Sequence, residues 1–411
     1  MAYFVFAAVM IGIQLLTLVE AVRHIIYTRR KYRPQPSKYH PKTALITPCK
    51  GHDTTFERNI RALFRMDYPA YEIFFVVESE TDPAHGRLVE IIREMKEAGS
   101  RSKAHLLVAG LAQTSSQKLH NQLFVYRRIP RDFEVLSFID SDACPKPHFL
   151  ASLVHPLRRA EVGAATGYRW FVPEDKSLSS KVLSAMNAVF ASMLGPHNWN
   201  TTWGGAMAMK RELFERLGVE ALWKNSITDD YTLTYAVQQA ELEVIFVPAC
   251  FVASYEHMDW RTLFSFARRQ FLITRVYKPR LWWLALASYG SAMAVFWGGL
   301  IVSVALLAQN SPWAKWAAIL PGFLYLSWMF KAVARQLFIF KILREDRGRL
   351  RAPARLDIFL QPVVSLFTLA TLVASGLTRT ILWRGYRYVL HGMGRTEIIR
   401  EGTAAAGTVR R

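Results

Sequence analysis

The chain has 411 residues, enough for two or three domains, and 51% of them are hydrophobic, with 25 Phe and 12 Trp. This content is high for a soluble protein and indicates membrane-spanning segments. The formal net charge is +20, but the basic residues gather beside apolar stretches. An anionic membrane surface explains them more simply than nucleic acid does, so we expect no nucleic-acid partner. Three cysteines without C-x-x-C or zinc-type spacing argue against disulfides and a zinc site.

Four stretches are nearly uninterrupted in apolar residues, namely 3–22, 281–307, 313–330 and 358–377. Each approaches or exceeds the roughly 20 residues that a helix needs to cross ~30 Å of hydrocarbon. The first stretch lacks both a preceding basic segment and a small-residue cleavage site, so we interpret it as an anchor rather than a cleaved signal. Residues 34–277 have the composition of a soluble α/β domain, which we expect to be inserted between the first two spans.

Basic residues near the spans predict the orientation. Those that directly follow the first stretch are Arg23, Arg29, Arg30, Lys31, Arg33, Lys38 and Lys42. We therefore expect the inserted domain to be cytoplasmic, and a second basic cluster, 335–355, returns to that side if the next two stretches form a hairpin. A full fourth span would place the following arginines outside, against the rule. Gln361 and Pro362 allow a broken, re-entrant or interfacial helix instead, and the side of the C-terminal segment stays open.

Strands and helices alternate along residues 43–140. The expected strands are 43–47, 71–77, 105–109 and 134–140, and the expected helices are 54–66, 83–98 and 117–126. Strand, helix and strand at this spacing require a right-handed crossover between parallel strands, so we predict a sheet of the nucleotide-binding type. The chain has neither G-x-G-x-x-G after the first strand nor a Walker lysine motif, which disfavours a dinucleotide or P-loop site.

Asp140 and Asp142 form a D-x-D motif at the carboxyl end of the fourth expected strand. Open α/β sheets bind their ligands at this edge. Two carboxylates separated by one residue can share a hard divalent cation that holds a diphosphate. The motif alone is weak, because two aspartates in a turn are about as often solvated turn formers.

Three further positions have both a functional and a structural interpretation. Glu78, at the end of the second strand, could accept a hydrogen bond from a base N–H or a ribose hydroxyl. Alternatively, it is part of a solvated loop. Gly204 and Gly205 follow Trp203 and allow either close backbone approach to a ligand or tight packing. Further strands are expected at 163–166 and 203–209, the latter followed by a short helix.

The segment Thr228, Asp229 and Asp230 precedes a helix expected to run to about residue 240. Thr228 or Asp229 suits the N-cap of that helix, which gives one carboxylate a structural explanation. Asp230 has no such explanation and is a candidate for catalysis. Residues 255–277 place apolar side chains on one helical stripe with arginines largely off it, which predicts a basic amphipathic helix lying in the membrane interface.

Together these features resemble membrane-bound glycosyltransferases of the family 2 and 21 type with a GT-A fold, in particular ceramide glucosyltransferases and bacterial lipid glycosyltransferases, including the hopanoid ones. The resemblance covers nearly the whole chain. It is carried by Cys49, Lys50, Gly51, Asn59, Leu63, Phe64, 67–69, Tyr71, Glu72, 82–84, Lys118, Asn121, Asp140, Asp142, 229–231, 383–388 and 396–398. Each piece is weak alone, and the combination is specific.

The resemblance implies roles for individual residues. Asp230 is the expected general base that deprotonates the acceptor hydroxyl. Asp142, with Asp140 beside it, is the expected ligand of Mg²⁺ or Mn²⁺. The expected nucleotide-sugar contacts are Lys50, Glu78, Lys118, Asn121, Asp140, Gly204, Gly205, Asp229 and Arg269.

Arg269 marks a departure from the family's pattern. In the expected (Q/R)-x-x-R-W motif on the interfacial helix, this chain retains the arginine and lacks both the leading polar residue and the tryptophan, since residues 266–270 read FARRQ. We assign Arg269 to the diphosphate, and an arginine that faces lipid headgroups is the alternative.

The predicted architecture is an α/β GT-A domain combined with α-helical transmembrane segments. Its parts are a transmembrane anchor 1–30, a cytoplasmic glycosyltransferase domain 31–257, an amphipathic interfacial helix 258–280, C-terminal transmembrane or interfacial helices 281–382 and a basic tail 383–411. The protein is expected in a membrane, the inner membrane if the chain is bacterial.

The predicted reaction is inverting transfer of a sugar, with glucose preferred, from a UDP-sugar to the hydroxyl of a membrane lipid such as ceramide. The alternatives are a hopanoid or diacylglycerol acceptor, a processive polysaccharide synthase, and a non-catalytic membrane protein that binds nucleotide sugars. A synthase predicts more spans and an intact Q-x-x-R-W motif, and intact Asp140, Asp142 and Asp230 argue against a non-catalytic protein.

Overall fold

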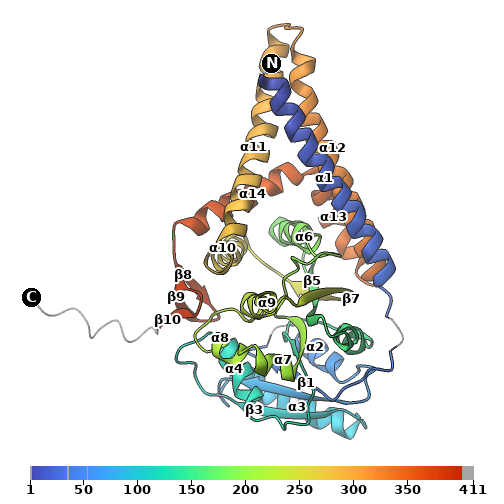
Figure 1. Ribbon diagram of the computed structural model, residues 1–411, viewed down its shortest axis with the longest axis vertical. Coiled ribbons are helices and arrows are strands. Elements are labelled where there is room, and N and C mark those ends of the chain that lie inside the picture. The colour runs from blue at the N-terminus through green and yellow to red at the C-terminus, as the bar shows by residue number, and fades with distance from the viewer. Residues whose placement is uncertain (1, 35–36, 53, 400–411) are drawn as a thin grey trace, which may run out of the picture. The chain divides into compact units, whose positions relative to one another are not determined.

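The computed structural model describes residues 2–34, 37–52 and 54–399 (Figure 1). The chain divides into two compact units. The sheet unit comprises Lys31–Arg169, His197–Ser254 and the segment from Thr378 onward, and the helical unit comprises the segment up to Arg30, Trp170–Pro196 and Tyr255–Leu377. The sequence analysis assigned residues 170–196 to the domain 31–257 and the residues from 383 onward to a separate tail. In the structure, residues 170–196 belong to the helical unit, and the segment from Thr378 onward belongs to the sheet unit.

A seven-stranded sheet with the order β3-β2-β1-β4-β6-β5-β7 forms the centre of the sheet unit. β1, β2, β3 and β4 are parallel, and β6 pairs antiparallel with β4 and β5. The strands are β1 (Thr43–Pro48), β2 (Tyr71–Val77), β3 (Lys103–Val108), β4 (Val135–Ile139), β5 (Val162–Pro173), β6 (Ala206–Lys210) and β7 (Glu243–Glu256). The sheet is therefore mixed. Its parallel strands, β1 to β4, agree with the predicted parallel sheet.

Both faces of the sheet are covered, which explains why its strands are almost continuous in apolar residues. Successive residues of a strand point to opposite faces. Leu45 of β1 and Ile73 of β2 accordingly enter one core with helices α2 and α3, whereas Ile46 and Phe74 enter a second core with α4 and α9. The helices of this unit are α2 (Phe56–Leu63), α3 (Pro83–Glu97), α4 (Gln117–Tyr126), α5 (Phe149–Val154), α7 (Arg211–Arg216), α8 (Val219–Trp223) and α9 (Asp229–Gln239).

A second, three-stranded antiparallel sheet follows the helical unit in sequence (Figure 1). It consists of β8 (Thr380–Trp383), β9 (Tyr386–Gly392) and β10 (Arg395–Ile399). The sequence analysis assigned residues from 383 onward to a basic tail. The strands form because Tyr388 and Leu390 alternate with the exposed Arg387, so that β9 buries one face. Residues 400–411 lie outside the described part of the chain.

Among the described residues, three helices are long and apolar enough to cross a membrane, namely Ala8–Lys31 within α1 (Ala2–Lys31), α11 (Pro279–Ala308) and α12 (Ala314–Ile342). A fourth apolar segment is bent by 86° between α13 (Arg347–Phe359) and α14 (Gln361–Gly376). The break falls at Leu360, directly before Gln361 and Pro362, where the sequence analysis allowed a broken, re-entrant or interfacial helix.

The amphipathic helix α10 runs from Trp260 to Tyr277, five residues shorter at its start than expected, because residues 255 and 256 complete β7. Asp259 caps it by accepting a hydrogen bond of 2.7 Å from the backbone N–H of Thr262. Leu263, Ala267 and Phe271 of the expected apolar stripe are buried. The helical unit also contains α6 (Leu178–Ala191).

A buried ion pair joins α12 to α13 within the helical unit. Arg335 Nε donates to Asp357 Oδ2 at 2.6 Å, and Gln336 Nε2 donates to the same oxygen at 2.8 Å. Asp357 is fully buried, so removal of either charged partner alone would leave an uncompensated charge and would be strongly destabilising. This contact ties the end of α13, close to the break at Leu360, to α12.

Candidate active site

The D-x-D motif forms a tight turn just past the end of β4. Asp140 N donates to Gly205 O at 3.3 Å, and Ala143 N donates to Asp140 O at 3.1 Å. Asn59 of α2 reaches the turn, where its Nδ2 donates to the backbone oxygen of Ser141 at 3.2 Å. Contacts from two other segments therefore fix the direction in which the two carboxylates leave the sheet.

Lys118 of α4 lies between two of the candidate carboxylates. Its Nζ is 2.7 Å from Asp140 Oδ1 and 3.0 Å from Asp229 Oδ2. Gln122, one helical turn later, donates from Nε2 to Asp229 Oδ2 at 3.0 Å. Burial lowers the pKa of Lys118, but the two carboxylates outweigh it and hold that pKa above its ordinary value. We call Lys118, Gln122, Asp140 and Asp229 the lysine cluster.

The two glycines of the Trp203 segment make room for side chains of the site itself. A Cβ on Gly204 would lie 2.2 Å from Asp229 Oδ1, and a Cβ on Gly205 would lie 2.3 Å from Trp203 Cζ2. Both positions exclude any side chain, because Asp229 and Trp203 fill the adjacent space. The packing interpretation therefore has a direct geometric basis, and a ligand contact by these glycines stays a prediction.

Asp142 pairs with an arginine, whereas Asp140 pairs with Lys118. Arg169 of β5 places Nη1 3.3 Å from Asp142 Oδ2, and the guanidinium lies 5.3 Å from the centroid of the Trp203 ring. The other oxygen, Oδ1, is buried and has no hydrogen-bond partner among the described residues. Burial raises the pKa of Asp142; Arg169 opposes the shift and neighbouring Asp140 adds to it.

The donor set fits a divalent cation that completes its coordination with phosphate. Asp140 and Asp142 offer carboxylate oxygens, and the partnerless Oδ1 of Asp142 would gain a ligand there. No group of three or more His, Cys, Asp or Glu side chains among the described residues could hold a metal alone. Mg²⁺ is commonly held by one or two carboxylates together with substrate phosphates. Mn²⁺ prefers the same oxygen ligands.

Asp230 is the second residue of α9 and is half-buried. Its Oδ1 accepts hydrogen bonds from the Thr228 hydroxyl and, at 2.7 Å, from the backbone N–H of Tyr231. Thr228 is the N-cap residue, as expected, but its hydroxyl serves Asp230 instead of capping the helix. Burial, followed by the charge of Asp229, raises the pKa of Asp230 to about 6. Such a value suits a general base at neutral pH.

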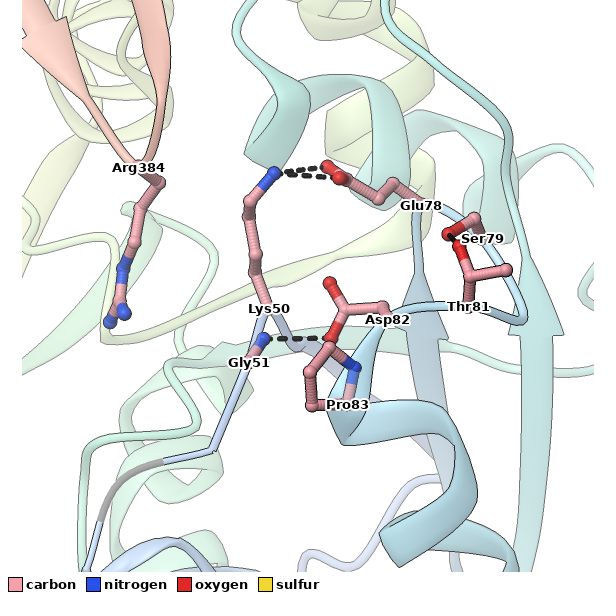
Figure 2. Close-up of a pocket in the computed structure, with 8 residues that line it drawn as sticks. All are labelled: Lys50, Gly51, Glu78, Ser79, Thr81, Asp82, Pro83 and Arg384. Carbon is pink, nitrogen blue, oxygen red and sulfur yellow. Dashed lines mark hydrogen bonds and ion pairs between the residues drawn. The ribbon is translucent and has the colours of Figure 1, made fainter.

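A pocket of about 420 Å³ opens beside the carboxyl ends of β1 and β2 (Figure 2). Lys50 Nζ lies 2.6 Å from both carboxylate oxygens of Glu78. The Tyr386 hydroxyl donates to Glu78 Oε2 at 3.1 Å, and Lys50 Nζ lies 4.3 Å from the centroid of the Tyr386 ring. The lining residues are Lys50, Gly51, Glu78, Ser79, Thr81, Asp82, Pro83 and Arg384.

The sequence of the chain matches a known protein family. The sequence model of glycosyl transferase family 21 matches residues 2–396. The chain belongs to glycosyl transferase family 21. It is therefore an enzyme of the glycosyltransferase class. The predicted combination of an α/β domain with long apolar helices is confirmed.

The family 21 chain also resembles a ceramide glucosyltransferase over part of its length. It is 29% identical over 105 residues to a ceramide glucosyltransferase of Komagataella phaffii, a match that covers 22% of this chain and 20% of that protein. The chain thus spans about a fifth of the relative's length in this match.

Two solved structures are also similar to this chain. A mannosyltransferase of Pyrobaculum calidifontis in complex with GDP-Man and Mn²⁺ is 17% identical, with a TM-score of 0.48 and coverage of 91% of this chain and 96% of that one. A glucosyl-3-phosphoglycerate synthase of Mycobacterium tuberculosis in complex with Mn²⁺ and UDP-glucose is 14% identical, with a TM-score of 0.38 and coverage of 59% and 83%, respectively.

Most of the predicted site residues of this family 21 enzyme lie in the sheet unit, and two differ from expectation in their surroundings. Asn121 is 2% exposed and bonds inside the protein: its Oδ1 accepts from Gln117 Nε2 at 2.8 Å, and its Nδ2 donates to Val76 O at 3.5 Å. Arg269 belongs to the helical unit, where its guanidinium lies 5.3 Å from the centroid of the Phe266 ring. Nucleotide contact by either residue stays a prediction.

The sequence analysis did not single out two residues that contact the predicted carboxylates, Arg169 and Gln122. It counted Arg384 and Tyr386 among the residues 383–388 that carry the resemblance but gave them no role, and in the structure Arg384 lines the pocket and Tyr386 contacts Glu78. Gln122 follows Lys118 by one helical turn, a spacing that the sequence does display. Arg169 comes from β5, and its pairing with Asp142 depends on the order of strands, which local sequence does not encode.

Proposed function

We propose that this family 21 enzyme transfers glucose from UDP-glucose to the hydroxyl of a membrane lipid such as ceramide, with inversion at the anomeric carbon and release of UDP. The printed name of the Komagataella relative supports both the sugar and the acceptor. Three helices long enough to span a membrane support an amphiphilic acceptor. We further propose that the sheet unit is cytoplasmic and that the basic residues face anionic lipid.

One observation carries the proposal. Asp230, with its raised pKa, directly follows Asp229, and Lys118 links Asp229 to Asp140 of the D-x-D motif. A candidate base and candidate diphosphate-binding carboxylates are thus connected within the sheet unit. A reaction between an alcohol and an activated sugar diphosphate needs both functions close together.

The chain's own groups suffice for the acceptor half of the reaction. Asp230 is ionised at neutral pH because its pKa is about 6, and its Oδ2 can accept the proton of the acceptor hydroxyl as that oxygen attacks C1 of the sugar. The Thr228 hydroxyl and the Tyr231 N–H hold Oδ1 and so fix the direction of the carboxylate. Attack from the face opposite to the departing UDP converts an α-linked donor into a β-linked product.

On the donor side, we propose that Glu78 and Lys50 contact the uracil or ribose, and that Arg269 contributes to the diphosphate. A bound Mg²⁺ or Mn²⁺, held by Asp142 together with Asp140, would stabilise the negative charge that develops on UDP. Lys118 pairs with both Asp140 and Asp229 and so holds them in place, which makes it a positioning residue.

The experiment is UDP release by the full-length protein in detergent with Mn²⁺. UDP-glucose, UDP-N-acetylglucosamine and UDP-galactose are each combined with ceramide, diacylglycerol and a hopanoid alcohol. We expect release with UDP-glucose and ceramide, and a loss of ~10²–10⁴ in rate for Asp230→Asn. The matched control is Asp132→Asn, an exposed aspartate of the sheet unit. Release that does not depend on any lipid, or is equal in the two variants, would refute the proposal.

A further inference from the structure

The turn between β8 and β9 has an unusual residue at its tip. Trp383 pairs with Tyr386, so the turn consists of Arg384 and Gly385 alone, with φ values of +50° and +83°. Two-residue hairpin turns with both φ values positive usually contain Asn, Asp or Gly, and an arginine in this conformation is uncommon. Such strained positions cluster at functional sites. Arg384 is exposed and lines the pocket (Figure 2).

Two tyrosines of the hairpin attach it to the rest of the sheet unit. The Tyr388 side chain is 1% exposed, and its hydroxyl accepts a hydrogen bond of 3.3 Å from Gln117 N at the start of α4. Tyr386 donates to Glu78 at the end of β2. Tyr386 and Tyr388 lie on the same face of β9, as their spacing requires. The position of Arg384 is therefore set by the same unit that carries the D-x-D motif.

The charged side chains of the pocket differ in whether they already have a partner within the protein. Lys50 is held by both oxygens of Glu78, and Asp82 Oδ1 accepts from the backbone N–H groups of Gly51 at 2.8 Å and Ala84 at 2.9 Å. Arg384 makes no ion pair or hydrogen bond with the residues that the structure describes. Arg384 is thus the pocket cation that can bind an anion without first losing a protein partner.

We infer that Arg384 binds the diphosphate of the nucleotide donor, and that the β8–β9 hairpin forms one wall of the donor site. The inference rests on the proposed function, because it takes the pocket as the nucleotide site. A guanidinium offers two parallel N–H groups that match two phosphate oxygens, whereas an ammonium offers a point charge. The ligand class is a nucleoside diphosphate, with UDP as the probe.

The test compares two arginines of one hairpin. Arg384→Ala removes the pocket cation, and Arg387→Ala removes an exposed cation on the opposite face of β9. Dissociation constants for UDP and for uridine are measured by calorimetry on the full-length protein in detergent. We expect Arg384→Ala to weaken UDP about 10–100-fold and to leave uridine unchanged, because a charge-assisted contact to phosphate is lost. Arg387→Ala should match the wild type within about twofold, and Arg384→Lys should restore part of the UDP affinity.

Equal UDP affinities of Arg384→Ala and Arg387→Ala would overturn the inference, as would a parallel loss of uridine affinity in Arg384→Ala. A wild-type protein that binds UDP without lipid-dependent UDP release would refute the proposed transfer, while the two variants would still decide the role of Arg384. A folded wild-type protein that does not bind UDP would overturn both. Thermal unfolding midpoints verify that the variants are folded.

Discussion

The lysine cluster and the pocket beneath the β8–β9 hairpin differ in how their charges are satisfied. In the lysine cluster, Lys118 contacts two carboxylates, and Gln122 contacts one of them as well. In the pocket, Lys50 and Glu78 pair with each other, while Arg384 stays exposed at a strained turn. The first region is held rigid by its own charges, whereas the second keeps one cation available for a ligand. A count of charged residues would not distinguish the two regions.

The largest effect is expected from removing the cation of the lysine cluster. Lys118→Met leaves Asp140 and Asp229 uncompensated, which should lower the free energy of unfolding by about 3–5 kcal/mol. Lys103→Met, at an exposed position of β3, is the control and should change it by less than about 0.5 kcal/mol. Thermal unfolding in detergent measures both. If Lys118→Met were no less stable than the control, the lysine cluster would not be structural.

A smaller loss is expected when the space next to Asp229 is filled. Gly204→Ala places a Cβ against Asp229 Oδ1, whose side chain cannot withdraw without loosening from Lys118 and Gln122. We expect a destabilisation of about 1–3 kcal/mol, seen in thermal unfolding, together with reduced turnover.

The control for this substitution is Gly86→Ala in α3, where a Cβ would meet no atom within 4 Å. Alanine should stabilise that helix by about 0.4–1 kcal/mol. A Gly204→Ala protein with wild-type stability and turnover would show that the carboxylate is free to move.

Acidification should affect activity and stability in opposite directions at Asp230. Its pKa of about 6 means that the base becomes protonated as the pH falls through this value, so kcat/KM should fall about tenfold per pH unit below about pH 6. Because the folded-state pKa is raised, the Asp230 contribution to stability increases over the same fall in pH. Turnover and thermal unfolding measured between pH 4.5 and 8 separate the two effects. A flat kcat/KM profile would exclude Asp230 as the base.

The smallest effect is expected where the hairpin is anchored. Tyr388→Phe removes the hydroxyl that accepts from Gln117 N and should cost about 1 kcal/mol of stability. UDP affinity should fall only a few-fold, because Arg384 itself remains. Tyr235→Phe, on an exposed face of α9, serves as the control. A loss of UDP affinity as large as that of Arg384→Ala would assign the binding effect to hairpin anchoring.

The parallel half of the sheet could be predicted from sequence because its signals are local. The apolar run of β2 and the segment after Ser116, which caps α4 by accepting from Leu119 N, gave the observed bounds of both elements. The carboxylates of the site were visible for the same reason, since they directly follow buried strands or begin a helix.

The missing parts depend on contacts distant in sequence. The pairing of Arg169 with Asp142 requires the antiparallel placement of β6 and β5, and no local pattern specifies that placement. The position of Arg384 beside Lys50 requires a C-terminal hairpin to be anchored to α4 and β2. The alternation of Tyr386, Tyr388 and Leu390 is a local pattern that indicates a strand. The elements to which that strand attaches, α4 and β2, cannot be inferred from it.

The position of the hairpin along the chain has a consequence for biosynthesis. Lys50 and Glu78 are translated early, whereas Arg384 and Tyr386 leave the ribosome only after all three candidate membrane spans and the bent pair α13 and α14. A nascent chain therefore lacks one wall of the proposed donor pocket until the three spans and the bent pair have been made. Competence to use the sugar donor would then be acquired only after these segments have been translated, so that chains still lacking the hairpin would not consume it.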